Sequence, residues 1–285
     1  MNATKSFSPD ETFKSRVHEQ QRLISQRMRH VKHKIAVISG KGGVGKSTVT
    51  VNLAAAFAKK GKQVGVLDAD IHGPSVPRLL GLTGQQMRVG PPGAFPVLGP
   101  LGMKVVSIDF FLEEENTPTI WRGPLKMTAI RQFLSDVAWG NLDMLLIDLP
   151  PGTGDEPLSI AQLLPKIDGV LIVTMPSELS RAVVKKAITF ARRVGMPIIG
   201  VIENMSGYIC PKCGEKIDIF QSGGGEKMAK ESNVPFLGSI PIDPSVGADS
   251  DMGSPFVIEH ADSLAAKAFI EIVSKVEVYL KDNEN

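Results

Sequence analysis

The feature that most constrains the fold of this 285-residue sequence is one glycine-rich string, GKGGVGKST, from Gly40 to Thr48. It follows a short apolar run and opens a predicted helix, which is the context that the phosphate-binding pattern GxxxxGK[ST] requires. Glycines let the backbone curl so that successive N–H groups point at phosphate oxygens, and the helix N-terminus adds a favourable dipole. The string therefore predicts a nucleotide site at a strand-to-helix junction.

Two residues of this loop have individual chemical roles. Lys46 is expected to bridge the terminal phosphates of ATP, and Ser47 is expected to offer its hydroxyl to Mg²⁺. The predicted nucleotide contacts of the loop are Gly40, Lys41, Gly42, Gly43, Val44, Gly45, Lys46, Ser47 and Thr48.

The rest of the chain repeats one pattern: a short apolar run that ends in Gly or Asp, followed by a longer helical stretch. This pattern is typical of consecutive βαβ units, and several runs lack in/out alternation, as strands buried on both faces do. We expect a doubly wound α/β fold with a mostly parallel sheet of about seven or eight strands and helices on both faces. The predicted strands are Ile35–Ser39, Val64–Asp68, Lys104–Asp109, Met144–Asp148, Val170–Thr174, Ile198–Glu203 and Phe236–Ile240.

Residues 1–33 are polar and basic, and we expect a flexible tail or a short surface helix there. Residues 34–285 are expected to form one ATPase domain, with long loops at 84–100 and 204–225. The 32 basic and 30 acidic side chains nearly balance, which argues against non-specific binding to nucleic acid or to an anionic membrane. The sequence lacks an apolar run of membrane-spanning length and an apolar leader, so we expect a cytoplasmic protein.

Acidic residues end two of the predicted strands, where ligands of open α/β sheets bind. Asp148 follows the apolar run 144–147, and this placement suits a carboxylate that holds Mg²⁺ through its water shell. Asp70 belongs to the string Asp68-Ala-Asp70 after an earlier strand. An aspartate in such a place is often only a cap or turn former. The presence of both beside a phosphate loop favours the functional interpretation.

The two cysteines of the chain, Cys210 and Cys213, lie in the second long loop with CxxC spacing. This spacing places two thiolates on one side of a tight turn, but a tetrahedral zinc site or a four-iron cluster needs about four thiolates. A symmetric dimer supplies four. Three interpretations stay open: a subunit-bridging iron–sulfur cluster, a subunit-bridging zinc ion, and a dithiol/disulfide redox switch.

The chain resembles the Mrp-type iron–sulfur cluster carrier ATPases of the deviant Walker A, MinD-like superfamily. Five strings carry the resemblance, in this order: GKGGVGKST, DADIHGPS, TIWRGP, DLPPGTGDEPLS and NMSGYICPKCG. The resemblance extends from about Lys34 to the C-terminus. It implies a homodimer that binds a [4Fe-4S] cluster between subunits through Cys210 and Cys213 and passes it to apo iron–sulfur proteins. It also implies slow ATP hydrolysis coupled to cluster loading or release.

The resemblance implies roles for further residues. Lys41 corresponds to the signature lysine that reaches across a nucleotide-sandwich dimer, where it would neutralise charge on the partner's ATP. Asp70 corresponds to the switch aspartate that orients or deprotonates the attacking water, so the implied catalytic set is Lys41, Lys46, Asp70 and Asp148. Adenine contacts are expected from Asn204, Pro241 and Asp243. The string Trp121–Pro124 is interpreted as a structural turn into a helix.

Two rival functions use the same loop. A positioning or partition ATPase of the MinD or ParA type needs a basic DNA-binding face or an amphipathic membrane helix at the C-terminus, and the C-terminal string EIVSKVEVYLKDNEN is not strongly basic. A zinc-bridged regulatory NTPase differs from the cluster carrier only in the metal at Cys210 and Cys213.

Overall fold

The computed structural model describes residues 9–111, 123–210, 212–220 and 222–284. Its centre is an eight-stranded sheet in which all neighbouring strands are parallel except the edge pair β6 and β5. This architecture confirms the predicted doubly wound, mostly parallel sheet. From edge to edge the strands are β12 (Phe236–Ser239), β9 (Ile198–Glu203), β8 (Gly169–Thr174), β1 (Val31–Ser39), β7 (Leu142–Asp148), β2 (Val64–Asp68), β6 (Lys104–Val106) and β5 (Val97–Leu98).

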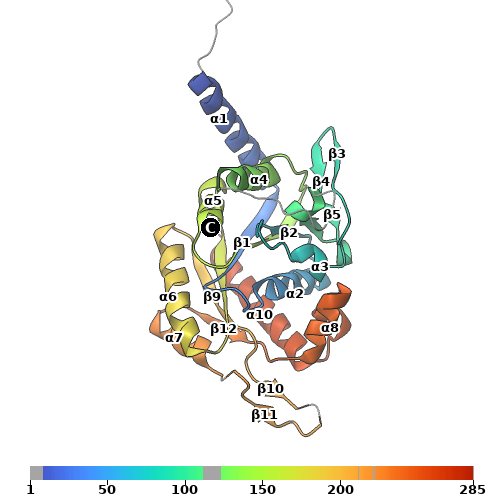
Figure 1. Ribbon diagram of the computed structural model, residues 1–285, viewed down its shortest axis with the longest axis vertical. Coiled ribbons are helices and arrows are strands. Elements are labelled where there is room, and N and C mark those ends of the chain that lie inside the picture. The colour runs from blue at the N-terminus through green and yellow to red at the C-terminus, as the bar shows by residue number, and fades with distance from the viewer. Residues whose placement is uncertain (1–8, 112–122, 211, 221, 285) are drawn as a thin grey trace, which may run out of the picture.

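Two hydrophobic layers cover the two faces of this sheet (Figure 1). Alternate residues of β1 enter opposite layers: Ile35 and Val37 belong to one, Ala36 and Ile38 to the other. The first layer is closed by α2 (Lys46–Lys59), α3 (Val76–Leu79), α9 (Phe256–Glu259) and α10 (Leu264–Asp282). The second is closed by α1 (Pro9–Met28), α4 (Gly123–Ser135), α5 (Asp155–Leu163), α6 (Glu178–Arg193) and α7 (Gly224–Glu231).

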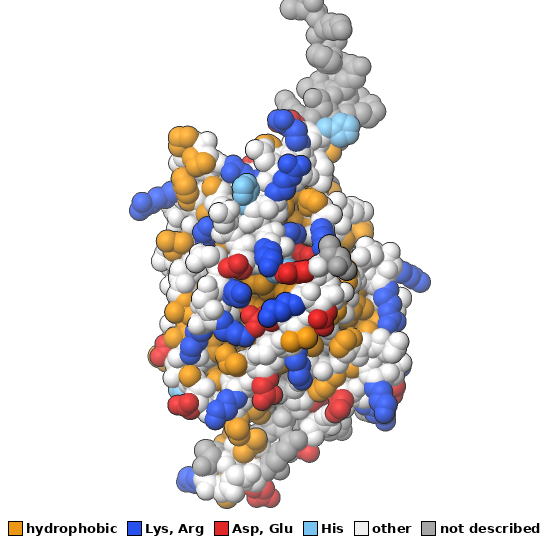
Figure 2. Space-filling view, turned by 180° about the vertical axis from the view of Figure 1, so that it is seen from behind, with side chains coloured by type: hydrophobic (Ala, Val, Ile, Leu, Met, Phe, Trp, Pro, Cys, Tyr) orange, Lys and Arg blue, Asp and Glu red, His pale blue; other side chains and the backbone are white. Residues whose placement is uncertain are grey.

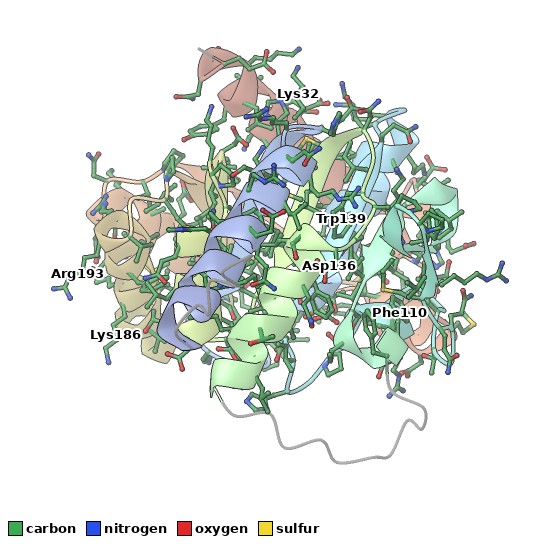
Figure 3. The ribbon with its side chains drawn as sticks, turned by 90° about the horizontal axis from the view of Figure 1, so that it is seen from above. Lys32, Phe110, Asp136, Trp139, Lys186 and Arg193 are labelled. Atoms are coloured by element: carbon green, nitrogen blue, oxygen red, sulfur yellow. The ribbon has the colours of Figure 1, made fainter. Side chains whose placement is uncertain are left out.

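The N-terminal segment differs from the flexible tail expected at residues 1–33. Its described part is the 20-residue helix α1, and β1 already begins at Val31. Ile24 and Met28, one helical turn apart, are buried against the sheet layer, and α1 lies alongside α4 (Figure 3). Of the two expected alternatives, a flexible tail or a short surface helix, residues 9–28 form the helix, and two apolar side chains on one face dock it on the domain.

The strand expected at Lys104–Asp109 is also shorter than predicted. β6 ends at Val106, and a 3₁₀ turn follows at Ile108–Phe111, in which the Phe110 N–H donates to the Ser107 carbonyl at 3.3 Å. The bounds of β2 and β9 agree with the prediction.

Both predicted long loops contain short antiparallel strands. The first holds the hairpin of β3 (Arg88–Gly90) and β4 (Gly93–Phe95), followed by β5. The second holds the hairpin of β10 (Tyr208–Ile209) and β11 (Lys216–Ile217), which projects from the body of the molecule (Figure 1). The remaining helix α8 (Pro244–Met252) lies between β12 and α9. Within the described ranges, no helix combines the length and the apolar character needed to cross a membrane.

Candidate nucleotide site and cysteine hairpin

The phosphate loop connects the end of β1 to the start of α2, as predicted. Gly43 and Gly45 have φ angles of 77° and 76°, in the left-handed region that favours glycine. A Cβ on Gly45 would also lie 2.3 Å from Nδ2 of Asn204, so a side chain does not fit there. The loop curls around a pocket of about 300 Å³ that is lined by residues of the loop and by Asp70 and Pro151.

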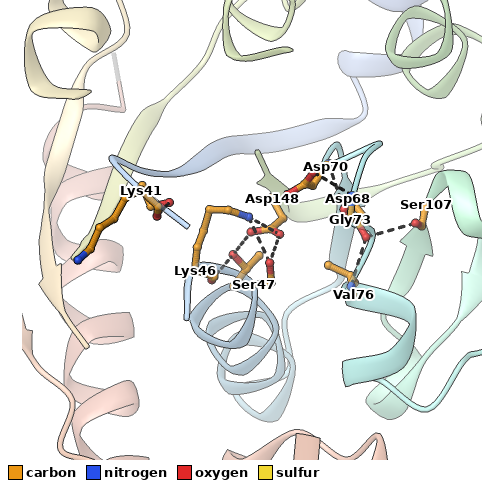
Figure 4. Close-up of polar contacts among 11 residues, drawn as sticks. Lys41, Lys46, Ser47, Asp68, Asp70, Gly73, Val76, Ser107 and Asp148 are labelled. Carbon is orange, nitrogen blue, oxygen red and sulfur yellow. Dashed lines mark hydrogen bonds and ion pairs between the residues drawn. The ribbon is translucent and has the colours of Figure 1, made fainter. Parts of the chain in front are cut away.

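Asp148 is the centre of a hydrogen-bond cluster at the start of α2 (Figure 4). Its Oδ2 lies 2.6 Å from Nζ of Lys46 and accepts a 2.6 Å hydrogen bond from the Ser47 hydroxyl. Its Oδ1 accepts a 2.7 Å hydrogen bond from the hydroxyl of Thr50. Asp148 is fully buried and Lys46 is 6% exposed, which strengthens the attraction between them. The structure thus brings Asp148 against three residues at the start of α2 that precede it by about one hundred positions in sequence.

This donor set fits a magnesium nucleotide. A carboxylate and a hydroxyl oxygen are the hard ligands that Mg²⁺ takes in such sites, and Lys46 supplies the cation for the phosphates. When bound, Mg²⁺ would neutralise charge on the phosphate oxygens. Ser47 and Asp148 would hold the ion, and the helix N-terminus behind the loop would favour the anion.

The two aspartates of the DAD string occupy different environments. Asp68 is buried and accepts hydrogen bonds at 3.2 Å from the backbone N–H groups of Asp70 and Val76 and from the Ser107 hydroxyl. Burial and the nearby charge of Asp148 raise the pKa of Asp68 to about 8. Asp70 lines the pocket, and partial burial raises its pKa as well. Asp70 therefore faces the pocket, its water-orienting role stays a prediction, and Asp68 accepts hydrogen bonds from the loop that carries it.

Lys41 lies at the rim of the same pocket, with its side chain directed away from Lys46 (Figure 4). Within the part of the chain that the structure describes, its ammonium forms no ion pair. Its predicted role on the nucleotide of a second copy stays a prediction.

The three residues predicted to contact adenine differ in their distance from the phosphate loop. Asn204 lies against the loop and donates from Nδ2 to the Val44 carbonyl at 2.9 Å. Pro241 and Asp243 do not line the pocket, and the Asp243 carboxylate instead caps α8 by accepting from the Ser245 N–H at 3.0 Å. The adenine roles of all three residues stay predictions.

The cysteine pair lies at the end of the β10–β11 hairpin. Cys213 is exposed and Cys210 is half-buried. The backbone N–H groups of Cys213 and Lys212, together with the Cys213 thiol, hydrogen-bond to the Cys210 sulfur and lower the pKa of its thiol. A lowered pKa favours the thiolate, which is the form that binds metal. Among the described residues, no cluster of three or more His, Cys, Asp or Glu side chains is placed to hold a metal ion.

Comparison with known proteins agrees with this geometry. Residues 30–277 match the ParA family model described as NUBPL iron-transfer P-loop NTPase. The chain belongs to this family. Curated relatives named iron–sulfur cluster carrier protein include one from Saccharolobus solfataricus, 53% identical over 92% of this chain and 88% of the relative. Another, from Methanocaldococcus jannaschii, is 54% identical over 96% of this chain and 93% of the relative.

Solved structures of related proteins share the family's fold. A nucleotide-binding protein from Archaeoglobus fulgidus, in complex with ADP, is 46% identical, covers 82% of this chain and 92% of its own, and has a TM-score of 0.74. The cell division protein MinD from Aquifex aeolicus has a TM-score of 0.63 over 86% of this chain and 97% of its own. At 23% identity, the MinD likeness concerns the fold alone.

Glu203 is a buried residue beside the site that the sequence reasoning missed. It ends β9 directly before Asn204, is fully buried, and accepts hydrogen bonds from residues at both ends of the cysteine segment. The Ser206 hydroxyl donates at 2.5 Å and the Gly223 N–H at 3.0 Å, while the Gly225 N–H donates to the other oxygen. A charged residue that ends an apolar strand is a signal that was present in the sequence.

Two further contacts were also missed. The Thr50 hydroxyl reaches Asp148 because it lies one helical turn after Lys46 on α2. Lys126 forms a 2.7 Å ion pair with Glu156 and so joins α4 to α5. This pair follows the Trp121–Pro124 string, of which Trp121 and Arg122 lie outside the described residues and Gly123 begins α4.

Proposed function

We propose that this chain is an ATP-dependent iron–sulfur cluster carrier, in which a homodimer binds a [4Fe-4S] cluster and transfers it to apo iron–sulfur proteins. The observation that carries the proposal is the exposed CxxC pair with a lowered thiol pKa, on a hairpin that supplies only half of a four-thiolate site. The printed names of the curated relatives support the same cargo.

The proposal assigns hydrolysis to the pocket at the phosphate loop. Lys46 and Ser47 bind the phosphates and Mg²⁺, Asp148 holds both side chains in place, and Asp70 orients water. Lys41 acts on the nucleotide of the second copy, as its outward direction supports. Hydrolysis thereby depends on the assembly that also joins the cysteine pairs.

Nucleotide state and cluster binding are coupled through the segment 203–206. Asn204 hydrogen-bonds the phosphate loop, and the adjacent Glu203 ties down both ends of the cysteine segment. Ser206 N–H also donates to the Ile240 carbonyl at 2.9 Å, which fixes the base of the hairpin to the end of β12. A movement of the phosphate loop at Val44 is therefore transmitted to the hairpin through the hydrogen bonds of Asn204 and Glu203.

Anaerobic reconstitution of the full chain with iron and sulfide tests the proposal. The wild type should bind about four irons per two chains, and the double variant C210S/C213S should bind none while it retains wild-type affinity for ATP. Retention of the cluster by the double variant would refute the assignment of the thiols. Stoichiometric zinc in the wild type would instead favour the zinc-bridged NTPase.

A further inference from the structure

The solvent-facing sides of α6 and α7 carry mostly basic side chains. On α6, buried apolar residues and exposed basic residues recur at helical spacing, so the basic residues share one side of the helix. Figure 3 shows Lys186 and Arg193, about two helical turns apart, directed outward at the edge of the molecule. We call this surface the α6–α7 face. Its exposed basic residues are Lys185, Lys186, Arg192, Arg193, Lys227 and Lys230.

The charge of the α6–α7 face differs from that of the chain as a whole. Among the side chains that the structure describes on these two helices, six exposed ones are basic and two, Glu226 and Glu231, are acidic. The face therefore has an excess of four positive charges, whereas the whole chain has a net charge of +2. Figure 2 shows Lys and Arg side chains along the right-hand edge of the molecule, where α6 and α7 lie. Such an excess of one sign attracts a partner of the opposite sign.

The two helices form one continuous surface. They pack against each other, and the Lys185 ammonium lies 3.1 Å from the Glu231 carboxylate. The Arg192 guanidinium donates to the Ser232 carbonyl at 2.7 Å, directly after the end of α7. These contacts fix the basic residues of α6 relative to those of α7, so a partner meets a preformed charge pattern.

The α6–α7 face adjoins both functional regions. α6 touches the phosphate loop, because a Cβ on Gly40 would lie 2.7 Å from the Val183 side chain. α7 begins where the cysteine segment ends, and the buried Glu203 accepts from the N–H groups of Gly223 and Gly225 at this junction. Figure 1 shows α7 at the end of the molecule from which the cysteine hairpin projects. A molecule bound to this face is therefore at the same end as the cysteines.

The chemistry of cluster transfer indicates which partner suits this face. In the proposed function, thiolates of the acceptor replace Cys210 and Cys213 on the iron, so the acceptor has to bind beside the hairpin. Charge complementarity then requires an acceptor with an acidic surface around its own cysteines. A nucleic acid fits less well, because Glu226 and Glu231 lie among the basic residues and would repel phosphates.

We propose that the α6–α7 face is the docking surface for acidic apo iron–sulfur proteins that receive the cluster from Cys210 and Cys213. The face speeds encounter with the acceptor and brings its thiols to the hairpin. The inference rests on the proposed function, because it requires that the cysteines carry a cluster for transfer. It adds the surface that the acceptor binds and the charge that the acceptor carries.

Charge reversal on α6 tests the face. The reconstituted full chain is mixed with an acidic apo-ferredoxin of the two-cluster [4Fe-4S] type, and the iron content of the re-isolated ferredoxin is followed over time. In K186E/R193E the second-order rate constant of transfer should fall about tenfold at low salt. Added salt should slow transfer from the wild type but not from this variant. K62E/R88E is the matched control, because Lys62 and Arg88 are exposed outside the face and the net charge is the same. It should keep most of the wild-type rate.

A second variant, K227E/K230E, tests the α7 half of the face and should show a similar loss. Both variants should load iron and bind ATP as the wild type does, so that slow transfer reports docking alone. Wild-type rates and salt dependence in both variants would overturn the inference and leave the proposed function standing. Wild-type binding to duplex DNA at about 0.15 M salt that K186E/R193E loses would also overturn it, since the face would then bind nucleic acid. If the wild type itself bound no iron, the proposed function would fail instead.

Discussion

The nucleotide site and the cysteine hairpin are built in opposite ways. Lys46 and Asp148 come from distant parts of the chain, are buried, and find all their partners within one molecule. Cys210 and Cys213 come from one tight turn, Cys213 is exposed and Cys210 is half-buried, and the hydrogen bonds to the Cys210 sulfur come from the same turn. The buried contacts of the first site lie within a single chain, whereas the second site offers two of the four thiolates that the proposed cluster needs.

Because of this difference, substitutions in the two sites should have different effects on stability and binding. In the nucleotide site, a substitution removes a buried partner, so stability and ligand binding should fall together. In the hairpin, a substitution removes a solvent-facing group, so metal binding and association should fall while the fold is unchanged. Glu203 and Asn204 lie between the two regions, where both kinds of effect should meet.

The largest effect is expected at Lys46, with Lys41 as its control. K46M leaves the buried Asp148 carboxylate without its cation, so the free energy of unfolding should fall by about 3 kcal/mol. ATP affinity should fall about 100-fold because a charged contact to phosphate is lost. K41M should keep both quantities and lose hydrolysis alone. Urea unfolding and equilibrium nucleotide binding measure these changes. Equal losses of stability and of ATP affinity in K46M and K41M would contradict the different roles assigned to the two lysines.

A smaller loss of stability is expected from substitution of Glu203, which lies between the nucleotide site and the cysteine hairpin. Gln offers one acceptor oxygen in place of two, so E203Q should lower the free energy of unfolding by about 2 kcal/mol. Iron retention by the reconstituted protein should also drop, since both ends of the cysteine segment lose an anchor. E226Q is the control, because Glu226 is exposed in the first turn of α7. An E203Q variant as stable and as iron-rich as the control would contradict the coupling route.

A further loss of stability is expected from substitution of Thr50 in the nucleotide site. T50V removes one hydroxyl donor from the buried Asp148 and should cost about 1.5 kcal/mol of unfolding free energy. Thr189 offers a matched control, since both hydroxyls donate to the carbonyl four residues earlier, at 3.0 Å for Thr50 and 2.8 Å for Thr189. Thr189 is exposed and, among the residues that the structure describes, has no carboxylate partner, so T189V should be nearly neutral. Equal losses of unfolding free energy in T50V and T189V, measured by thermal or urea unfolding, would mean that the hydrogen bond from Thr50 to Asp148 does not stabilise the fold.

The last expected effect is a pH dependence of stability that arises from Asp68. Its pKa rises from 3.8 to about 8 on folding, so between these values the folded chain holds a proton that the unfolded chain has released. Because folding takes up a proton in this range, a rising pH disfavours the folded chain, and the wild type should lose stability as the pH rises from about 5 to 8. D68N carries no titrating group there and should show a flatter profile. Urea unfolding at several pH values tests this, and parallel profiles would refute the raised pKa.

Local patterns in the sequence were enough to predict the sheet and the phosphate loop. The loop is a continuous string, and β2 and β9 are apolar runs bounded by clear signals, so their bounds agree with the structure. The docking of α1 was not predicted, because Ile24 and Met28 gain their partners only when α4 is in place.

The candidate site was predictable to a similar, limited degree. Lys46, Ser47 and Asp148 meet as expected because strand ends of a parallel sheet share one edge. Thr50 and Glu203 depend on side-chain directions within the folded chain, which motif spacing does not report.

The most direct test of the account is metal analysis of anaerobically prepared protein together with its mass in solution. The account predicts about four irons and matching sulfide per two chains, broad absorbance in the blue, and a dimer that dissociates when the cluster is removed. Iron held by a single chain would contradict the half-site at Cys210 and Cys213. Stoichiometric zinc without iron would contradict the cargo itself.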